Sequence, residues 1–164
     1  MVTSACWIWT GAVADDGYGR LWATPNTTAA DGARGPVLSP ARWTWQAHHG
    51  PIQAGLVVRH QCDQSLCVRP ACLLLGAPAD NAHDALRRDR LTIPGRTGKA
   101  DRRGTHRAAL ALRTAVLRAV EAGVYEPAAL AAVAARVQAA GDPYASQPEL
   151  PSLPPGFSAQ GRLF

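Results

Sequence analysis

Residues 58–73 read VRHQCDQSLCVRPACL, a histidine followed by three cysteines. The cysteine intervals are regular, because four residues separate Cys62 from Cys67 and four more separate Cys67 from Cys72. Four thiolates complete the tetrahedral coordination of a structural zinc ion, and the remaining cysteine of the sequence is Cys6. We therefore predict that Cys6, Cys62, Cys67 and Cys72 bind one Zn²⁺ ion. Such a site has no open coordination position, so its role is structural.

Two alternatives remain for these cysteines. They are incidental buried thiols, or they form disulfides. The loop has little apolar mass to hold its shape by packing, and metal binding would supply the missing folding energy. Residues 1–9 lack the basic and apolar regions of a signal peptide. We therefore expect a cytoplasmic protein with reduced cysteines, which disfavours a secreted two-disulfide protein. No apolar run reaches the roughly 18 residues of a membrane span.

The basic residues are concentrated in one segment. The chain carries a net charge of +5, and residues 87–107 hold eight basic residues against two acidic ones. A concentrated basic segment is expected of a protein that binds a polyanion such as nucleic acid. A solvated basic loop is the alternative.

Secondary-structure signals indicate a mixed N-terminal part and a helical C-terminal part, and therefore an α+β fold. The turn Asp15-Asp16-Gly17 predicts a hairpin, and Pro40 and Pro127 stand where helices commonly start. The expected strands are 6–11, 18–22 and 56–60, and the expected helices are 40–47, 79–90, 105–123 and 127–141. We divide the chain into a core (1–91), a basic linker (92–104), a helical hairpin (105–141) and a proline-rich arm or tail (142–164).

Further motifs accompany the histidine and the cysteines, in a consistent order. They are Cys6–Gly11, Tyr18-Gly19, Ala41-Arg42, His49–Ile52, Leu75-Gly76, Asp80-Asn81, Arg88 and Arg90. Together with residues 58–73 they resemble the core of homing-type HNH endonucleases, which belong to the His-Me finger or ββα-metal group. The resemblance covers residues 5–91. It implies a small ββα-metal core, stabilised by zinc, that hydrolyses phosphodiester bonds.

The resemblance also implies roles for individual residues. His60 would be the general base that activates water for attack on the phosphorus. Asn81 would hold one Mg²⁺ ion through its amide oxygen, and this ion would stabilise the leaving 3′ oxygen. Arg42, or else Arg20, would contact the scissile phosphate.

Two positions depart from the family pattern. Cys72 stands where the family usually has histidine, although a thiolate closes the same tetrahedron, and Arg69 replaces a usual asparagine. A catalytically silent, zinc-stabilised DNA-binding module is therefore the alternative function. Taken alone, His60 would be interpreted as a structural histidine and Asn81 as a helix-start residue. Their positions in the motif favour catalysis instead.

The implied substrate is double-stranded DNA, and the implied source is a prokaryote or a phage. Homing-type relatives act as dimers, so we expect a homodimer in which residues 142–164 form an arm. The helices of 105–141 form either a helix-turn-helix or a packing hairpin, and the alanine-rich second helix favours packing. The arginines expected to contact DNA are Arg20, Arg87, Arg88, Arg90, Arg102 and Arg103.

Other conspicuous side chains are given structural roles. His83 lies on the predicted helix of Asn81, and we expect it to face solvent, with a second metal ligand or a phosphate contact as the alternative. The side chains expected to be structural or to lie in the core are His48, His49, Trp7, Trp9, Trp43 and Trp45.

Overall fold

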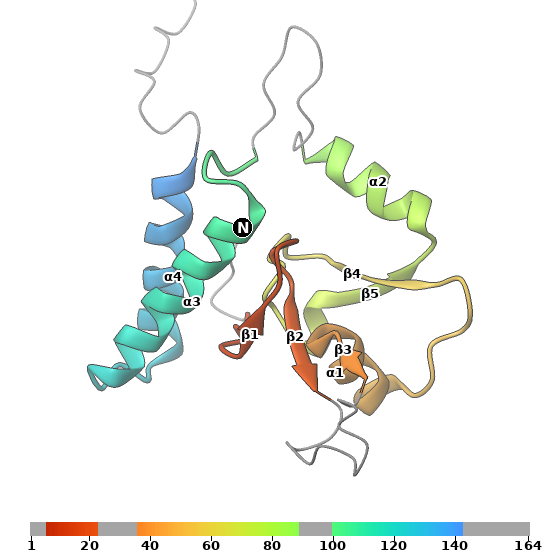
Figure 1. Ribbon diagram of the computed structural model, residues 1–164, viewed down its shortest axis with the longest axis horizontal. Coiled ribbons are helices and arrows are strands. Elements are labelled where there is room, and N and C mark those ends of the chain that lie inside the picture. Colours follow the sequence, from red (N-terminus) through yellow and green to blue (C-terminus); the bar gives the residue numbers. More distant parts are fainter. Residues whose placement is uncertain (1–5, 23–35, 89–99, 143–164) are drawn as a thin grey trace, which may run out of the picture.

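The computed structural model describes residues 6–22, 36–88 and 100–142. Its elements are β1 (Ala12–Val13), β2 (Gly19–Trp22), β3 (Val37–Leu38), α1 (Pro40–His49), β4 (Val57–His60), the short 3-10 helix η1 (Pro70–Cys72), β5 (Leu73–Gly76), α2 (Pro78–Arg87), α3 (Thr105–Glu121) and α4 (Pro127–Gly141). The expected α+β class is confirmed. In Figure 1 the strands β1 and β2 lie between α2 on one side and the pair α3–α4 on the other.

The unit β4–β5–α2 forms from the segment with which the sequence analysis began. The β-branched run of β4 pairs antiparallel with the leucines of β5 in four residue pairs, from Val57↔Gly76 to His60↔Leu73. Pro78 then stands in the first turn of α2, and the Asp80 carboxylate accepts a hydrogen bond of 2.9 Å from the Ala77 amide. This interaction satisfies a free donor at the helix start. Two strands and a helix thus follow one another as a ββα unit.

The N-terminal segment pairs differently from expectation. The predicted strand 6–11 does not pair with 18–22. Instead, Trp9 N–H donates to Leu66 O and Val68 N–H donates to Trp7 O, each at 2.8 Å. The hairpin strand begins only at Ala12. The reason is local: the backbone groups of residues 7–9 are satisfied by the cysteine loop, which brings Cys6 beside the other cysteines.

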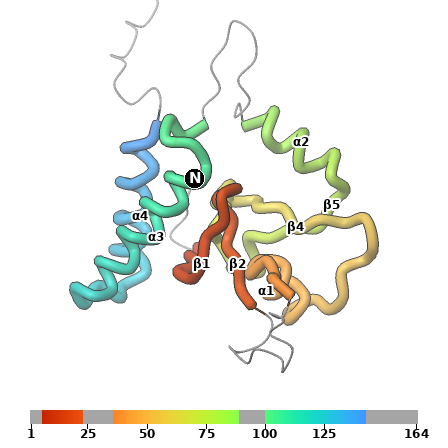
Figure 2. Tube along the Cα trace, in the orientation of Figure 1, coloured from red at the N-terminus to blue at the C-terminus, as the bar shows by residue number. Residues whose placement is uncertain are grey.

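The helices α3 and α4 pack against each other and against the N-terminal hairpin. Leu112, Val116 and Ala134 form their buried core, and Ile8 lies against it. Two side chains of α3 also reach the hairpin backbone. His106 Nδ1 lies 2.8 Å from Ala14 O, and Arg113 Nε donates to Thr10 O at 2.7 Å. The tube of Figure 2 shows the same neighbourhood of α3 and β1.

Two of the expected core tryptophans are exposed. Trp7 and Trp43 expose 55% and 53% of their surfaces, so their prediction as core residues was wrong. Trp9 and Trp45 are partly buried. The buried side chains of the cysteine loop are instead small or medium in size and include Leu66, Cys67 and Leu73.

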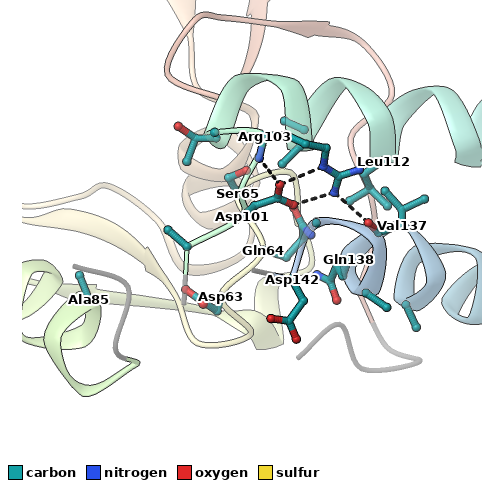
Figure 3. Close-up of a pocket in the computed structure, with 18 residues that line it drawn as sticks. Asp63, Gln64, Ser65, Ala85, Asp101, Arg103, Leu112, Val137, Gln138 and Asp142 are labelled. Carbon is teal, nitrogen blue, oxygen red and sulfur yellow. Dashed lines mark hydrogen bonds and ion pairs between the residues drawn. The ribbon is translucent and has the colours of Figure 1, made fainter. Parts of the chain in front are cut away.

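A cavity of about 1040 Å³ separates the cysteine loop and α2 from the helices α3 and α4. Figure 3 shows Asp63, Asp101 and Asp142 around it, with the Arg103 guanidinium held by Asp101 and by Val137 O. Burial opposes ionisation of Asp101, but the hydrogen bonds from Arg103 outweigh it and hold the pKa of Asp101 below its usual value. The neighbouring Arg102 N–H donates a hydrogen bond to Gly141 O, which ties this loop to the C-terminal end of α4.

Asp101→Asn is expected to lower the free energy of unfolding by about 1–2 kcal/mol, because it removes a half-buried, charge-assisted pair. Urea denaturation followed by circular dichroism measures this value. Glu121→Gln, a change of an exposed carboxylate at the end of α3, is the control and should shift the midpoint little. Equal stability of the two variants would show that the Asp101–Arg103 contact is not stabilising.

Among the described helices, none combines the length and the apolar composition that crossing a membrane requires. Most of the predicted linker 92–104, nearly all of the arm 142–164, and Arg90 lie outside the described residues.

Candidate active site and metal centre

The four cysteines come together although Cys6 is far from the others in sequence. Their sulfur atoms all lie within 4.8 Å of one another. Cys62 follows β4, Cys67 lies in the turn that pairs with Ile8, and Cys72 ends η1. Cys67 is fully buried. The predicted grouping of Cys6, Cys62, Cys67 and Cys72 is thereby confirmed as a cluster that could hold a metal.

The electrostatics of the cluster favour a cation. A hydrogen bond from Cys67 lowers the pKa of Cys62 to about 5. Burial, and then the nearby Cys62 charge, raise the pKa of Cys6 to about 11. The pKa of Cys67 is also raised, chiefly because its proton is shared with Cys62. Further thiolates beside the first need a compensating positive charge, which a divalent metal supplies. Four soft thiolates at this spacing fit Zn²⁺.

His60 is held in a defined orientation at the end of β4. Its side chain is buried, and Nε2 lies 2.9 Å from Cys67 O. A carbonyl oxygen only accepts hydrogen bonds, so Nε2 carries the proton and Nδ1 keeps its lone pair in the neutral ring. Burial is the main reason why the pKa of His60 is lowered, which favours this neutral form. The cysteine loop therefore orients His60 through the backbone of Cys67.

A cleft of about 310 Å³ brings His60 and Asn81 together. Asn81 reaches it from α2, where it is exposed. Its lining residues are Tyr18, Val57, Val58, His60, Asp63, Ser65, Pro78, Asn81 and Arg88. The Tyr18 ring lies against His60, with centroids 6.0 Å apart. A buried imidazole, an exposed amide and a guanidinium thus share one cleft.

Arg88 bridges the cleft and the cysteine loop. Its Nη1 donates to Asp63 Oδ1 at 3.0 Å, and Nη2 donates to Gln61 O at 3.2 Å. These contacts fix the end of α2 beside the residues that follow His60. Arg88 is only partly buried, so its guanidinium faces both the protein and the cleft.

The other predicted arginines lie elsewhere. Arg42 is exposed on α1 and is not among the residues that line the cleft. Arg20 is paired with Asp16 at 2.5 Å, and Arg103 is paired with Asp101. Arg87 and Arg102 are exposed.

The predicted site did not include Tyr18, Asp63 and Ser65. The sequence predicts no role for Tyr18, because its ring contact with His60 joins residues 42 positions apart. Asp63 has a φ of 62°, a left-handed backbone that non-glycine residues seldom adopt and that aspartate tolerates better than most. The signal in the sequence that could have pointed to Asp63 as a site residue is its position directly after Cys62. Ser65 Oγ donates to Gly17 O at 2.8 Å, which ties the cysteine loop to the hairpin.

Comparison with known proteins points in the same direction. Residues 41–83 match the family model of HNH endonucleases. The chain is 35% identical over 85 residues to Protein 7.7 of Escherichia phage T7, covering 52% of this chain and 58% of that protein. It is 33% identical over 90 residues to Protein 2.8 of the same phage, covering 55% of each. The chain thus spans little more than half the length of these relatives. No solved structure gives a significant match.

The matched segment contains β4, β5 and the part of α2 that bears Asn81. It also contains Cys62, Cys67 and Cys72, whereas Cys6 reaches the cluster from outside it. Over residues 41–83 this chain is therefore similar in sequence to the HNH endonuclease family, and the cysteine cluster and the ββα unit of the structure are consistent with that similarity.

Proposed function

We propose that the protein is a metal-dependent endonuclease that hydrolyses phosphodiester bonds of double-stranded DNA. The observation that carries the proposal is the cleft in which the buried His60 and the exposed Asn81 meet. In this role Nδ1 of His60 takes a proton from water, which attacks the phosphorus as the bond to the 3′ oxygen breaks. Nε2 stays bound to Cys67 O and holds the ring in place.

Asn81 would hold the catalytic ion. Mg²⁺ usually keeps several waters and binds few protein oxygens together with phosphate oxygens, so one exposed amide at the mouth of the cleft fits it. When bound, the ion would neutralise charge on the phosphate and on the leaving oxygen. The cysteine cluster would hold a separate Zn²⁺ ion, which stabilises the loop that orients His60.

Incubation of the protein with supercoiled plasmid and Mg²⁺ tests the proposal, with EDTA as the control. Nicked or linear DNA is expected only with the metal. Binding of DNA without cleavage in any divalent metal would favour the catalytically silent, zinc-stabilised DNA-binding module instead.

Arg88 is the best-placed side chain for the DNA phosphate, because it lines the cleft together with His60 and Asn81. Arg42, Arg20, Arg87, Arg90, Arg102 and Arg103 remain proposed contacts outside this cleft. The large cavity beside α3 is not a suitable DNA channel. Its charged lining consists of Asp63, Asp101, Asp142 and Arg103, which is acidic on balance.

Arg88→Gln is expected to weaken DNA binding roughly tenfold and to reduce the slope of log affinity against log salt by about one. Titration of a fluorescent duplex at several salt concentrations in EDTA gives both values. Arg136→Gln, which removes an exposed arginine of α4, is the matched control. An unchanged salt slope in Arg88→Gln would remove this arginine from the phosphate contacts.

We propose that the protein is a homodimer, because cleavage of both strands at one site in a single event needs two active sites. Residues 142–164 would form the arm of this dimer.

The division into a nuclease core (1–91), a linker (92–104) and a helical hairpin (105–141) is part of the same proposal. Reduced cysteines fit a cytoplasmic location. Light scattering should give twice the chain mass, and a monomer unchanged by deletion of residues 142–164 would contradict the dimer.

A further inference from the structure

Arg59 and His60 are neighbours on β4, and they face opposite ways. Successive side chains of a strand point to opposite faces. His60 points to the cleft, whereas Arg59 reaches α2, where its Nη1 lies 2.5 Å from Asp84 Oδ2. The two side chains expose only 16% and 18% of their surfaces. One dipeptide thus carries the proposed base and an anchor for the helix that bears Asn81.

The strand β5 leaves space for this anchor. Gly76 pairs with Val57 and so lies on the same face as Arg59. A Cβ atom at Gly76 would lie 2.5 Å from Arg59 Nε and 2.6 Å from Asp80 Oδ2. The guanidinium can therefore cross β5 only where the strand has no side chain. It then lies close to both Asp80 and Asp84, which are four residues apart on one face of α2.

The helix α2 has little else to fix its position. None of its residues is fully buried, so apolar burial, which normally seats a helix, contributes little here. Among the described residues, its polar contacts to the rest of the protein are the Arg59–Asp84 pair and the bonds of Arg88 just after its end. Arg59 Nε is buried without a hydrogen-bond partner in the described part of the chain, which is costly. An ion pair that served only to stabilise the fold would not need to leave this nitrogen buried without a partner.

We propose that Arg59, clamped by Asp84, is a positioning residue that fixes Asn81 relative to His60. Asn81 lies one helical turn before Asp84, so a shift of α2 moves Asn81 directly. This inference rests on the proposed nuclease function for its effect on the reaction. The arrangement of Arg59, Gly76 and Asp84 itself is independent of that function.

The test compares Asp84→Asn, Asp84→Glu and Asn81→Ala with the unchanged full-length, zinc-loaded protein. Asp101→Asn is the matched control, because it breaks a half-buried arginine pair of 2.6 Å whose two residues do not line the cleft. Mn²⁺ binding is followed by electron paramagnetic resonance without DNA, and plasmid cleavage is followed over a range of Mg²⁺ concentrations. Zinc content, circular dichroism and DNA affinity in EDTA report on folding and binding.

In Asp84→Asn we expect Mn²⁺ binding to weaken about tenfold, towards the value for Asn81→Ala, and kcat to fall about 10- to 100-fold. Zinc content and DNA affinity should not change. Asp84→Glu keeps the carboxylate and should recover part of the metal affinity. Asp101→Asn should lose stability without a change in Mn²⁺ binding.

Several results would overturn the inference. Normal Mn²⁺ binding and normal cleavage in Asp84→Asn would show that the pair does not position Asn81. If Asp84→Asn lost as much stability as Asp101→Asn, and the Mg²⁺ dependence of its cleavage did not shift, the Arg59–Asp84 pair would have only a structural role. If the unchanged protein neither binds Mn²⁺ nor cleaves DNA, the proposed function fails and the inference fails with it.

Discussion

Cys67→Ser is expected to abolish the cooperative fold of the N-terminal part of the protein. Cys67 is fully buried, and its sulfur is surrounded by those of Cys6, Cys62 and Cys72. Metal binding by such sites contributes on the order of 10 kcal/mol to folding, which is comparable with the whole stability of a typical domain. Few buried apolar side chains of the cysteine loop, chiefly Leu66 and Leu73, would remain to replace it.

The measurement combines thermal denaturation with zinc analysis of the purified protein. We expect about one zinc per chain in the unchanged protein, and much less in Cys67→Ser. Cys72→Ser and Cys72→His form a matched pair, because histidine is also a zinc ligand. Cys72→His should keep more zinc than Cys72→Ser. A Cys67→Ser variant with an unchanged melting curve would show that packing alone holds the loop.

His60→Ala is expected to lower the rate of DNA cleavage by about 10²- to 10⁴-fold, the contribution of a positioned general base. The zinc cluster and DNA affinity should survive, because among the described residues the His60 side chain is bonded to the loop through the Cys67 backbone oxygen, and the backbone contacts of residue 60 remain in the variant. Asn81→Ala should give a loss of similar size, since it removes the proposed metal ligand. Single-turnover rates with excess protein separate these effects from DNA binding.

The sequence allowed the chemistry of the site to be predicted better than its packing. Regular cysteine spacing and the flanking motif predicted the grouping of Cys62, Cys67 and Cys72, and the tetrahedral requirement of zinc added Cys6. The prolines predicted the starts of α1 and α4, because a fixed φ and a missing amide suit the first helical turn.

The failures have two physical origins, contacts made by backbone groups and the small size of the apolar core. The pairing of Trp7 and Trp9 with the cysteine loop is made by backbone groups, which leave no pattern in the side chains. The same holds for the bond between His60 and Cys67 O. Trp43 and Trp7 are apolar residues, yet their side chains are exposed, because this part of the protein is built around a cluster of four cysteines and few buried apolar side chains.

Cleavage of supercoiled plasmid by purified, zinc-loaded protein tests the central claim most directly, with His60→Ala and His48→Ala compared side by side in Mg²⁺. His48 is an exposed histidine of α1 whose ring, within the described residues, is hydrogen-bonded to its own helix at Thr44 O. The account predicts cleavage by the unchanged protein and by His48→Ala, and almost none by His60→Ala. Equal cleavage by all three proteins, or none by the unchanged protein, would contradict it.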